Sequence, residues 1–359
     1  MSRPALACSM LSSSGMKALS KNSTRLHRFY FGMNSRSFVL GVLLSMFVPK
    51  ITIATPIYKF TTVDVPGSVS TEVFGINDLG QTVGFYSDSS GLRHGFLRSA
   101  DGASFTFFKV PQGTGGTLGL GINNAGQIAG HYFDNSGFHG FVRSTAGSFV
   151  TFDDPQGVGN TAAFRMNASG KVSGFYFDSA GGVHGFVRSP GGTKFDNYDD
   201  PQGVGSTFGQ MINDSGQIAG HYTDSAGNVH GFIRSADGTS FINFDDPADF
   251  SVTCAQAIND LGAVTGFYLD DSGGTHGFVR SPDGSSFFNF DDPQGLNQTF
   301  ANGINDLGVL VGHYIDPSGH DHGFLATRVP EFSSTIVLLS IGCVTLVGFS
   351  WRQKRSRQG

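Results

Sequence analysis

Basic side chains and glutamate are both scarce in most of this 359-residue chain. Residues 55–331 contain 12 Lys and Arg side chains against 28 Asp and Glu side chains, a formal net charge of −16. Contacts to nucleic-acid phosphates need Lys and Arg, so this composition argues against nucleic-acid binding. Glutamate is limited there to Glu72 and Glu331, which excludes catalysis by a pair of glutamates.

Cysteine and catalytic motifs are rare as well. Of the three cysteines, only Cys254 lies between residues 55 and 331, so that stretch cannot contain a disulfide of its own. We expect Cys254 to be a small buried residue on an inner strand rather than a reactive nucleophile. The sequence also lacks a Gly-rich phosphate loop, a nucleophile elbow and a HExxH helix.

The chain does contain a repeat with a period of about 46 residues, present six times. In the second copy, four strand-like pieces run over residues 117–123, 127–133, 139–144 and 148–153, separated by turns that begin with Asp, Asn or Thr and end with Gly. Four short strands per repeat indicate a blade of a β-propeller. An Ile-Asn or Met-Asn step marks each copy, at Asn77, Asn123, Asn167, Asn213, Asn259 and Asn305.

The two ends of the repeat region are out of phase with each other. The region opens with a lone fourth strand over residues 58–65 and closes after a third strand over residues 322–327. Six whole blades form only if these two strands pair, and that pairing removes the exposed sheet edges. We therefore predict an all-β fold, a six-bladed β-propeller of four-stranded blades that is closed by the N-terminal strand.

Histidine and arginine recur on the third strand. Each histidine would sit in a different blade, so we expect its ring to satisfy a local backbone group rather than to share a metal with its copies. The arginines at the end of the strand are expected to pair with local acidic residues. The histidines are His94, His139, His184, His230, His276 and His322, and the arginines are Arg98, Arg143, Arg188, Arg234 and Arg280.

A second histidine pattern lies on the second strand. The residue before the repeated Tyr alternates between Phe and His, at Phe85, His131, Phe175, His221, Phe267 and His313. A three-histidine metal site would need these rings to converge on the propeller axis, where second strands do not lie. We interpret the alternation as alternating packing between neighbouring blades.

Aspartate is unevenly distributed between the turns. The turns from strand 2 to strand 3 and the loops from strand 4 to the next strand 1 share one end of a blade, which we name the top face, and eighteen aspartates fall there against seven at the other turns. The top face is either a solvated acidic rim or a site for a divalent cation, for which calcium with oxygen ligands is the candidate. The candidate ligands are the Asp-Asp-Pro steps: Asp153, Asp154, Asp199, Asp200, Asp245, Asp246, Asp291 and Asp292.

The repeats resemble a known family. Copies that read Ile-Asn-Asp-x-Gly, then Gly-[Phe/His]-Tyr-x-Asp, then His-Gly-Phe, and finally Asp-Pro-x-Gly, resemble the HAF family of bacterial extracellular repeats over residues 57–328. The resemblance implies an extracellular location and a repeat architecture. It implies no activity and no catalytic residues.

Targeting segments flank the repeats. Residues 1–54 read as an export signal, with Arg36, a 13-residue apolar run over 37–49 and a small-x-small step at residues 52–54; Met33 is an alternative translation start. Residues 329–359 resemble a PEP-CTERM sorting signal, with Val-Pro-Glu at 329–331, Phe332 in place of the second Pro, an uncharged span over 335–351 and a basic end. The resemblance implies anchoring through this span and processing by a sorting protease (exosortase); a plain membrane anchor is the alternative.

These features together predict domains at residues 1–54, 55–328 and 329–359, and a protein that is exported to the cell surface or beyond. The predicted role is binding or extracellular matrix formation, with a polysaccharide or a matrix protein as partner and no nucleic acid. The alternative is an extracellular polysaccharide hydrolase or lyase on a propeller scaffold, which rests on fold analogy alone.

Overall fold

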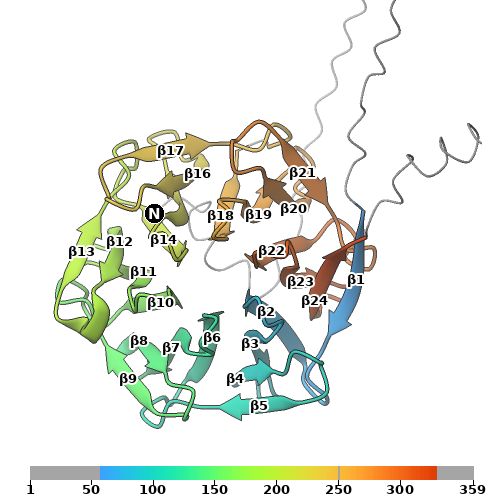
Figure 1. The fold of residues 1–359 in the computed structure, drawn as a ribbon, viewed down its shortest axis with the longest axis horizontal. Helices are drawn as coiled ribbons and strands as arrows, with labels where there is room; N and C mark the ends of the chain where they lie inside the picture. Colours follow the sequence, from blue (N-terminus) through green and yellow to red (C-terminus); the bar gives the residue numbers. More distant parts are fainter. Residues whose placement is uncertain (1–56, 250, 330–359) are drawn as a thin grey trace, which may run out of the picture.

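The computed structural model describes residues 57–249 and 251–329. They form six four-stranded antiparallel sheets arranged as a ring (Figure 1). In each sheet the first strand lies nearest the axis and the last on the perimeter. A single 3-10 turn, η1 (Pro190–Gly192), interrupts this all-β pattern in the described residues. The prediction of a six-bladed propeller is confirmed.

Five blades are continuous in sequence. Blade 1 is β2 (Ser70–Ile76), β3 (Thr82–Ser87), β4 (Arg93–Arg98) and β5 (Phe105–Phe108); blade 2 is β6 (Gly116–Ile122), β7 (Ile128–Asp134), β8 (Gly137–Arg143) and β9 (Phe149–Phe152). Blade 3 is β10 (Thr161–Met166), β11 (Val172–Phe177), β12 (Val183–Arg188) and β13 (Phe195–Tyr198); blade 4 is β14 (Thr207–Ile212), β15 (Ile218–Thr223), β16 (Val229–Arg234) and β17 (Phe241–Phe244). Blade 5 is β18 (Thr253–Ile258), β19 (Val264–Leu269), β20 (Thr275–Arg280) and β21 (Phe287–Phe290).

Blade 6 joins the two ends of the repeat region. It consists of β22 (Thr299–Ile304), β23 (Leu310–Ile315), β24 (Asp321–Arg328) and β1 (Tyr58–Val63). Strands β1 and β24 are antiparallel, in a register that runs from Tyr58 opposite Arg328 to Val63 opposite Gly323. The ring of Tyr58 also contacts that of Phe288 in blade 5, with centroids 5.5 Å apart. The predicted closure by the N-terminal strand is confirmed.

Glycine in the repeated His-Gly-Phe step makes room for an aromatic ring. A Cβ atom at Gly140 would lie 2.9 Å from the ring of Phe152 on the neighbouring outer strand. The Phe that follows, Phe141, is fully buried, as are its copies in all the other blades. The glycine two residues before the second-strand Tyr is equally constrained, because a Cβ atom at Gly130 would collide with the carbonyl oxygen of Leu118. These motifs are therefore packing requirements of the blade.

In five of the six repeats, the marking asparagine donates to the neighbouring blade at the end opposite the top face, which we name the bottom face. Asn77 donates from Nδ2 to the carbonyl oxygen of Asn123 at 3.1 Å. Asn305 donates to the carbonyl oxygen of Asn77 at 3.1 Å, so the contact also crosses the point where the ring closes. The same bond joins Asn167 to Asn213, Asn213 to Asn259, and Asn259 to Asn305. Because all these side chains are buried, losing one would leave a polar group unpaired.

Both predicted targeting segments lie outside the described residues. Within residues 57–249 and 251–329, no helix is long and apolar enough to span a bilayer.

We predict that closure is essential to stability. Deleting residues 58–65 removes strand β1 and exposes the edge of β24, so the protein should aggregate or lose about 10 °C or more in melting temperature. Calorimetry and light scattering measure the two outcomes. A chain that starts at Thr55 is the matched control, because it keeps β1. Equal melting temperatures for the two chains would contradict the requirement for closure.

Candidate functional site: the histidine–aspartate clasps of the top face

In five blades, the histidine near the start of the third strand lies between two aspartates of its own blade. In blade 2, His139 donates from Nδ1 to Asp153 at 2.9 Å and from Nε2 to Asp134 at 3.1 Å. Asp134 belongs to the turn from strand 2 to strand 3, and Asp153 begins the loop to the next blade. The ring therefore ties the two top-face segments together, and we name this unit a His–Asp clasp.

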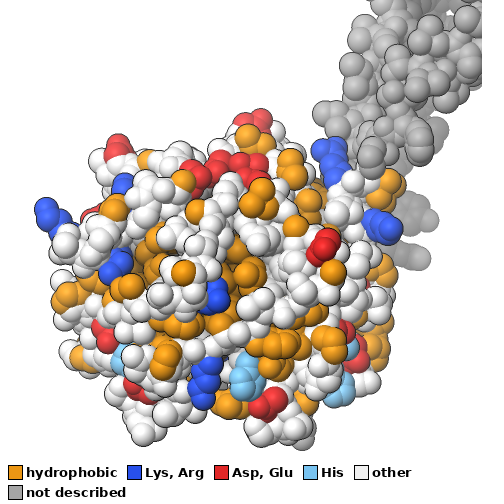
Figure 2. All heavy atoms as spheres, turned by 60° about the horizontal axis from the view of Figure 1, so that its bottom comes forward, with side chains coloured by type: hydrophobic (Ala, Val, Ile, Leu, Met, Phe, Trp, Pro, Cys, Tyr) orange, Lys and Arg blue, Asp and Glu red, His pale blue; other side chains and the backbone are white. Residues whose placement is uncertain are grey.

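The clasp recurs in five of the six blades. Blade 1 differs, because Lys109 stands where the other blades carry the loop aspartate, and His94 is bonded to Asp88 alone, at 2.8 Å. Figure 2 shows His side chains beside acidic ones along the lower edge of the molecule in that view. The remaining clasps are His184 with Asp199 and Asp178, His230 with Asp245 and Asp224, His276 with Asp291 and Asp270, and His322 with Asp64 and Asp316.

The sequence-based expectation of a backbone partner for these histidines was wrong. That expectation was based only on the strand that carries the histidine. The loop aspartate is 14 or 15 residues further along the chain in blades 2 to 5, and it arrives because strand 4 returns to the top face. A His and an Asp at these spacings, repeated in several copies, were the signal that could have revealed the pair.

Two carboxylates raise the pKa of each clasp histidine and so favour its charged form. Burial by itself lowers the pKa of His139, but its hydrogen bonds to Asp153 and Asp134 outweigh burial, and the pKa is raised. The same balance raises the pKa of His184, His230 and His276. Both ring nitrogens donate, as only the imidazolium can. On the other side of the pair, the Ser136 hydroxyl and N–H, together with His139, lower the pKa of Asp134 to about 2.

The second aspartate of each Asp-Asp-Pro step is buried and has a different role. Asp154 accepts from the backbone N–H of Gln156 at 2.8 Å and from Asn197 Nδ2 at 3.2 Å. Its own N–H donates to Thr161 at 3.0 Å, which explains the threonine repeated on every first strand. Burial raises the pKa of Asp154, and the two hydrogen bonds partly offset this. Asp200, Asp246 and Asp292 are equally buried and, like Asp154, each has one carboxylate oxygen without a partner.

The eight candidate calcium ligands therefore divide into two groups. Asp153, Asp199, Asp245 and Asp291 are bonded to histidine, whereas Asp154, Asp200, Asp246 and Asp292 are buried beneath the loops. Across residues 57–249 and 251–329, no three His, Cys, Asp or Glu side chains are grouped so that they could hold a metal ion. A calcium ion at the first group would have to compete with an imidazolium. Calcium binding stays a prediction.

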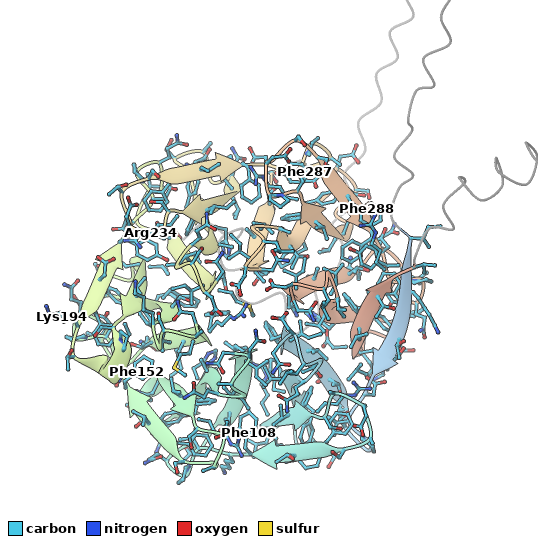
Figure 3. The ribbon with its side chains drawn as sticks, in the orientation of Figure 1. Phe108, Phe152, Lys194, Arg234, Phe287 and Phe288 are labelled. Carbon is cyan, nitrogen blue, oxygen red and sulfur yellow. The ribbon has the colours of Figure 1, made fainter. Side chains whose placement is uncertain are left out.

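Four of the five repeated arginines contact aromatic rings at the boundaries between blades. Arg234 lies over Tyr198 of the preceding blade, 4.3 Å from the ring centroid, and also pairs with Asp196 at 2.7 Å. It is the one arginine of this set with an ion pair among the described residues, so the expected pairing with local acids was largely wrong. Figure 3 shows Phe108, Phe152 and Arg234 at boundaries between neighbouring blades. The other contacts are Arg143 over Phe108, Arg188 over Phe152 and Arg280 over Phe244.

The second-strand histidines pack against aromatic rings. His221 and His313 are fully buried and stack on Phe208 and Phe300, with centroids 4.8 and 4.6 Å apart. Burial lowers the pKa of both histidines to about 3. They are neutral at physiological pH and fill the space that Phe fills in alternate blades, as the sequence predicted.

One buried titratable cluster breaks the symmetry and was missed by sequence reasoning. Glu72 of β2 is 2% exposed, and its Oε2 lies 4.0 Å from Nδ1 of His313 across the boundary between blades 1 and 6. Burial and nearby Asp321 raise the pKa of Glu72 well above its ordinary value, while Arg93 opposes them. Glu72 occupies a position that is apolar in the other copies, which was the available signal; there the residues are Leu118, Ala162, Phe208, Cys254 and Phe300.

Comparison with known proteins finds distant structural similarities only. No protein-family model and no curated protein matches the sequence. The structure is similar to regucalcin, a calcium-binding protein from Agrobacterium tumefaciens (14% identity, 77% of this chain and 94% of that chain, TM-score 0.48). It is also similar to a putative TolB from the same organism (11%, 77% and 99%, 0.49) and to a virginiamycin B lyase from Staphylococcus aureus (12%, 77% and 90%, 0.44). With TM-scores below 0.5, these similarities carry no argument about this protein.

We predict that the two kinds of histidine act on stability in opposite pH ranges. The raised pKa of the clasp histidines means that their stabilisation is complete below pH 6.5 and is lost as the pH rises through the higher folded value. Buried His221 and His313 stay neutral down to about pH 3, whereas the unfolded chain binds protons below about pH 6.5. Each therefore destabilises the fold by about 1.4 kcal/mol per pH unit between those limits.

The test is denaturant unfolding between pH 4 and pH 9. The double variant His221→Phe and His313→Phe, which copies Phe175 and Phe267, should reduce the acid-side decline and keep the alkaline one. The decline that is left includes the share of His131, whose pKa burial also lowers to about 3. Exposed His320→Ala is the control and should keep the wild-type profile. An unchanged acid-side slope in the double variant would show that the buried histidines do not control it.

The calcium prediction can be tested by melting curves in calcium and in chelator. If calcium binds the Asp-Asp-Pro carboxylates, it should raise the melting temperature in proportion to its occupancy. Asp153→Asn, Asp199→Asn, Asp245→Asn and Asp291→Asn combined should abolish that shift. Identical curves in both solutions would contradict calcium binding, and the clasp histidines would then be the partners of these carboxylates.

Proposed function

We propose that this protein is an extracellular binding protein whose acidic top face docks a basic segment of a matrix or surface partner. The observation that carries the proposal is the separation of charge between the two faces. Of the twelve Lys and Arg residues between 55 and 331, only Arg93 and Lys109 lie in the top half, where eighteen aspartates outnumber them and the five clasp histidines together. The other ten share the bottom half with eight aspartates. A field of this kind attracts cationic partners and speeds their association.

The positions of the side chains with shifted pKa values support a binding function over a catalytic one. A catalytic acid or base has to reach its substrate, but Glu72, His221 and His313 are all buried. The groups that solvent does reach, the clasps, repeat in five blades with the same partners, as structural units do. The alternative function, polysaccharide hydrolysis or cleavage by a lyase, would have to use the one asymmetric cluster, Glu72 with His313 and Asp321.

The location of the protein is part of the proposal. We infer that it is exported and held at the cell surface, at least temporarily, through the span at residues 335–351. The support is the sequence alone: the HAF-like repeats, the apolar run at residues 37–49 and the PEP-CTERM-like end with its implied exosortase. A polysaccharide remains the second class of partner.

We predict that binding to basic peptides depends on charges of the top face. The purified full-length protein should bind immobilised lysine-rich peptide at low salt, and the combined change of Asp153, Asp199, Asp245 and Asp291 to Asn should weaken binding about ten-fold. Asparagine keeps an oxygen acceptor for each clasp histidine, so the fold should persist; circular dichroism checks this. The matched control changes Asp101, Asp237 and Asp283, in bottom-face turns, to Asn and should have little effect.

A glycan array run in parallel separates the alternatives. Binding to a neutral polysaccharide, unaffected by the top-face variant, would contradict a charge-driven partner. Release of new sugar ends from a polysaccharide, lost in Glu72→Gln, would establish the enzymatic alternative instead.

A further inference from the structure

Exposed apolar side chains gather on the bottom face of three adjacent blades. Leu261 of blade 5, Leu307 of blade 6 and Leu79 of blade 1 sit in the turns from strand 1 to strand 2 and are 65%, 72% and 64% exposed. The equivalent residues in blades 2, 3 and 4 are Ala125, Ser169 and Ser215. The leucines are therefore confined to one side of the ring.

Backbone contacts hold these three turns next to one another. The N–H of Asp260 donates to Asp306 Oδ1, and the N–H of Asp306 donates to Asp78 Oδ1, both at 2.8 Å. Each of these aspartates directly precedes one of the leucines. The leucines thus form an arc with blade 6 at its centre.

The described chain enters and leaves the propeller on this same face of blade 6. Val329 donates from its N–H to the carbonyl oxygen of Ile57 at 2.7 Å, one step beyond the pair of Tyr58 and Arg328. In the other blades, the turn from strand 3 to strand 4 occupies the position that Ile57 and Val329 occupy in blade 6. That turn packs against the turn from strand 1 to strand 2 of the same blade. In blade 1, for example, a Cβ atom at Gly80 would lie 3.6 Å from Ala100.

The chain ends extend the apolar arc and add basic side chains. Ile57 and Val329 are 66% and 38% exposed, and Lys59 and Arg328 beside them are exposed as well. We name Leu79, Leu261, Leu307, Ile57 and Val329 the apolar patch. Apolar side chains flanked by long basic ones suit the boundary between lipid headgroups and acyl chains.

The charges decide which face can approach a bilayer. The top face has eighteen aspartates against two Lys or Arg residues and five clasp histidines, so an anionic lipid surface repels it. The bottom half, with ten basic residues and eight aspartates, is close to neutral. Beyond Val329 the sequence continues within six residues into the uncharged stretch 335–351. The shortness of this connection requires the face that carries Val329 to stay near any membrane in which that stretch is held.

We propose that the apolar patch docks on a lipid bilayer, so that the bottom face lies on the membrane and the top face points away from it. The inference rests on the proposed surface location, because the same membrane would hold the C-terminal span. It adds that the propeller itself contacts the lipid in a fixed orientation. The ligand surface of the top face is then presented to the extracellular side.

The single tryptophan of the chain, Trp351, makes the test direct. In full-length protein with Trp351→Phe, one reporter is placed at a time: Leu307→Trp in the apolar patch, and Val204→Trp, at an exposed position of the top face. The proteins are mixed with phosphatidylcholine–phosphatidylglycerol vesicles that carry brominated acyl chains. The emission maximum of the tryptophan at position 307 should shift to the blue, and its fluorescence intensity should fall by at least half. The emission of the tryptophan at position 204 should not change.

Matched variants separate contact with lipid from anchoring by the tail. In the Leu307→Trp chain, Leu79→Ser with Leu261→Ser should reduce the quenching at least two-fold, whereas Val158→Ser on the top face should not. If Trp351 of the native chain is quenched but the reporter at 307 is not, the tail anchors the protein and the propeller does not contact lipid. The docking proposal then fails, and the proposed surface location stands.

Three further outcomes would also contradict docking. Absence of quenching at both 351 and 307 overturns the surface location as well. Equal quenching at 307 and 204 overturns the fixed orientation. A blue shift at 307 without vesicles assigns the apolar patch to a second copy of the chain.

Discussion

Each sheet of this propeller is apolar on both faces, so a blade can bury its side chains only between two neighbours. The consequences run through the sequence. Phe141 and its copies fill the interior of each blade, and Gly140 and its copies give the outer-strand rings the space they need. Because every blade needs two neighbours, the last must meet the first, and β1 provides the missing fourth strand. The inter-blade hydrogen bonds of the asparagine step and the arginine–aromatic contacts then fix how the blades sit against each other.

The architecture could be predicted because its signals are local and repeated. The period, the turn residues and the mismatch between the chain ends depend on spacing along the sequence, and the structure confirms what they implied. The chemistry of the top face was harder to predict, because it depends on which segments meet there. His139 and Asp153 are separated by a whole strand and a turn, and only the return of strand 4 brings them together. Arg188 looked like a partner for acids, but its neighbour across the blade boundary is the ring of Phe152.

The departures from symmetry carry the remaining information. Lys109 leaves blade 1 with an incomplete clasp. Beside the closing boundary, Glu72 replaces an apolar residue of the other copies, and Asp321 stands where blade 1 has Arg93 and blades 2 to 5 have uncharged residues. A buried carboxylic acid beside a neutral histidine costs stability compared with the Leu or Phe found elsewhere, and such residues persist when they specify a contact. Burial raises the pKa of Asp321 to about 6, with Arg93 opposing it. The boundary that closes the ring is thus chemically unlike the others, which favours pairing of blade 6 with blade 1 over any other partner.

The two faces of the ring are specialised by the same alternation of turns. An antiparallel meander sends consecutive turns to opposite ends, so residues selected in one kind of turn accumulate on one face. Aspartate accumulates where the clasps need it, and the opposite face receives the third-strand arginines that hold the blades together. The charge separation therefore arises from structural demands, the clasps above and the blade contacts below. On such a scaffold, a few substitutions are enough to give the top and bottom faces different partners. One example is Leu307, which stands where blade 4 has a Ser.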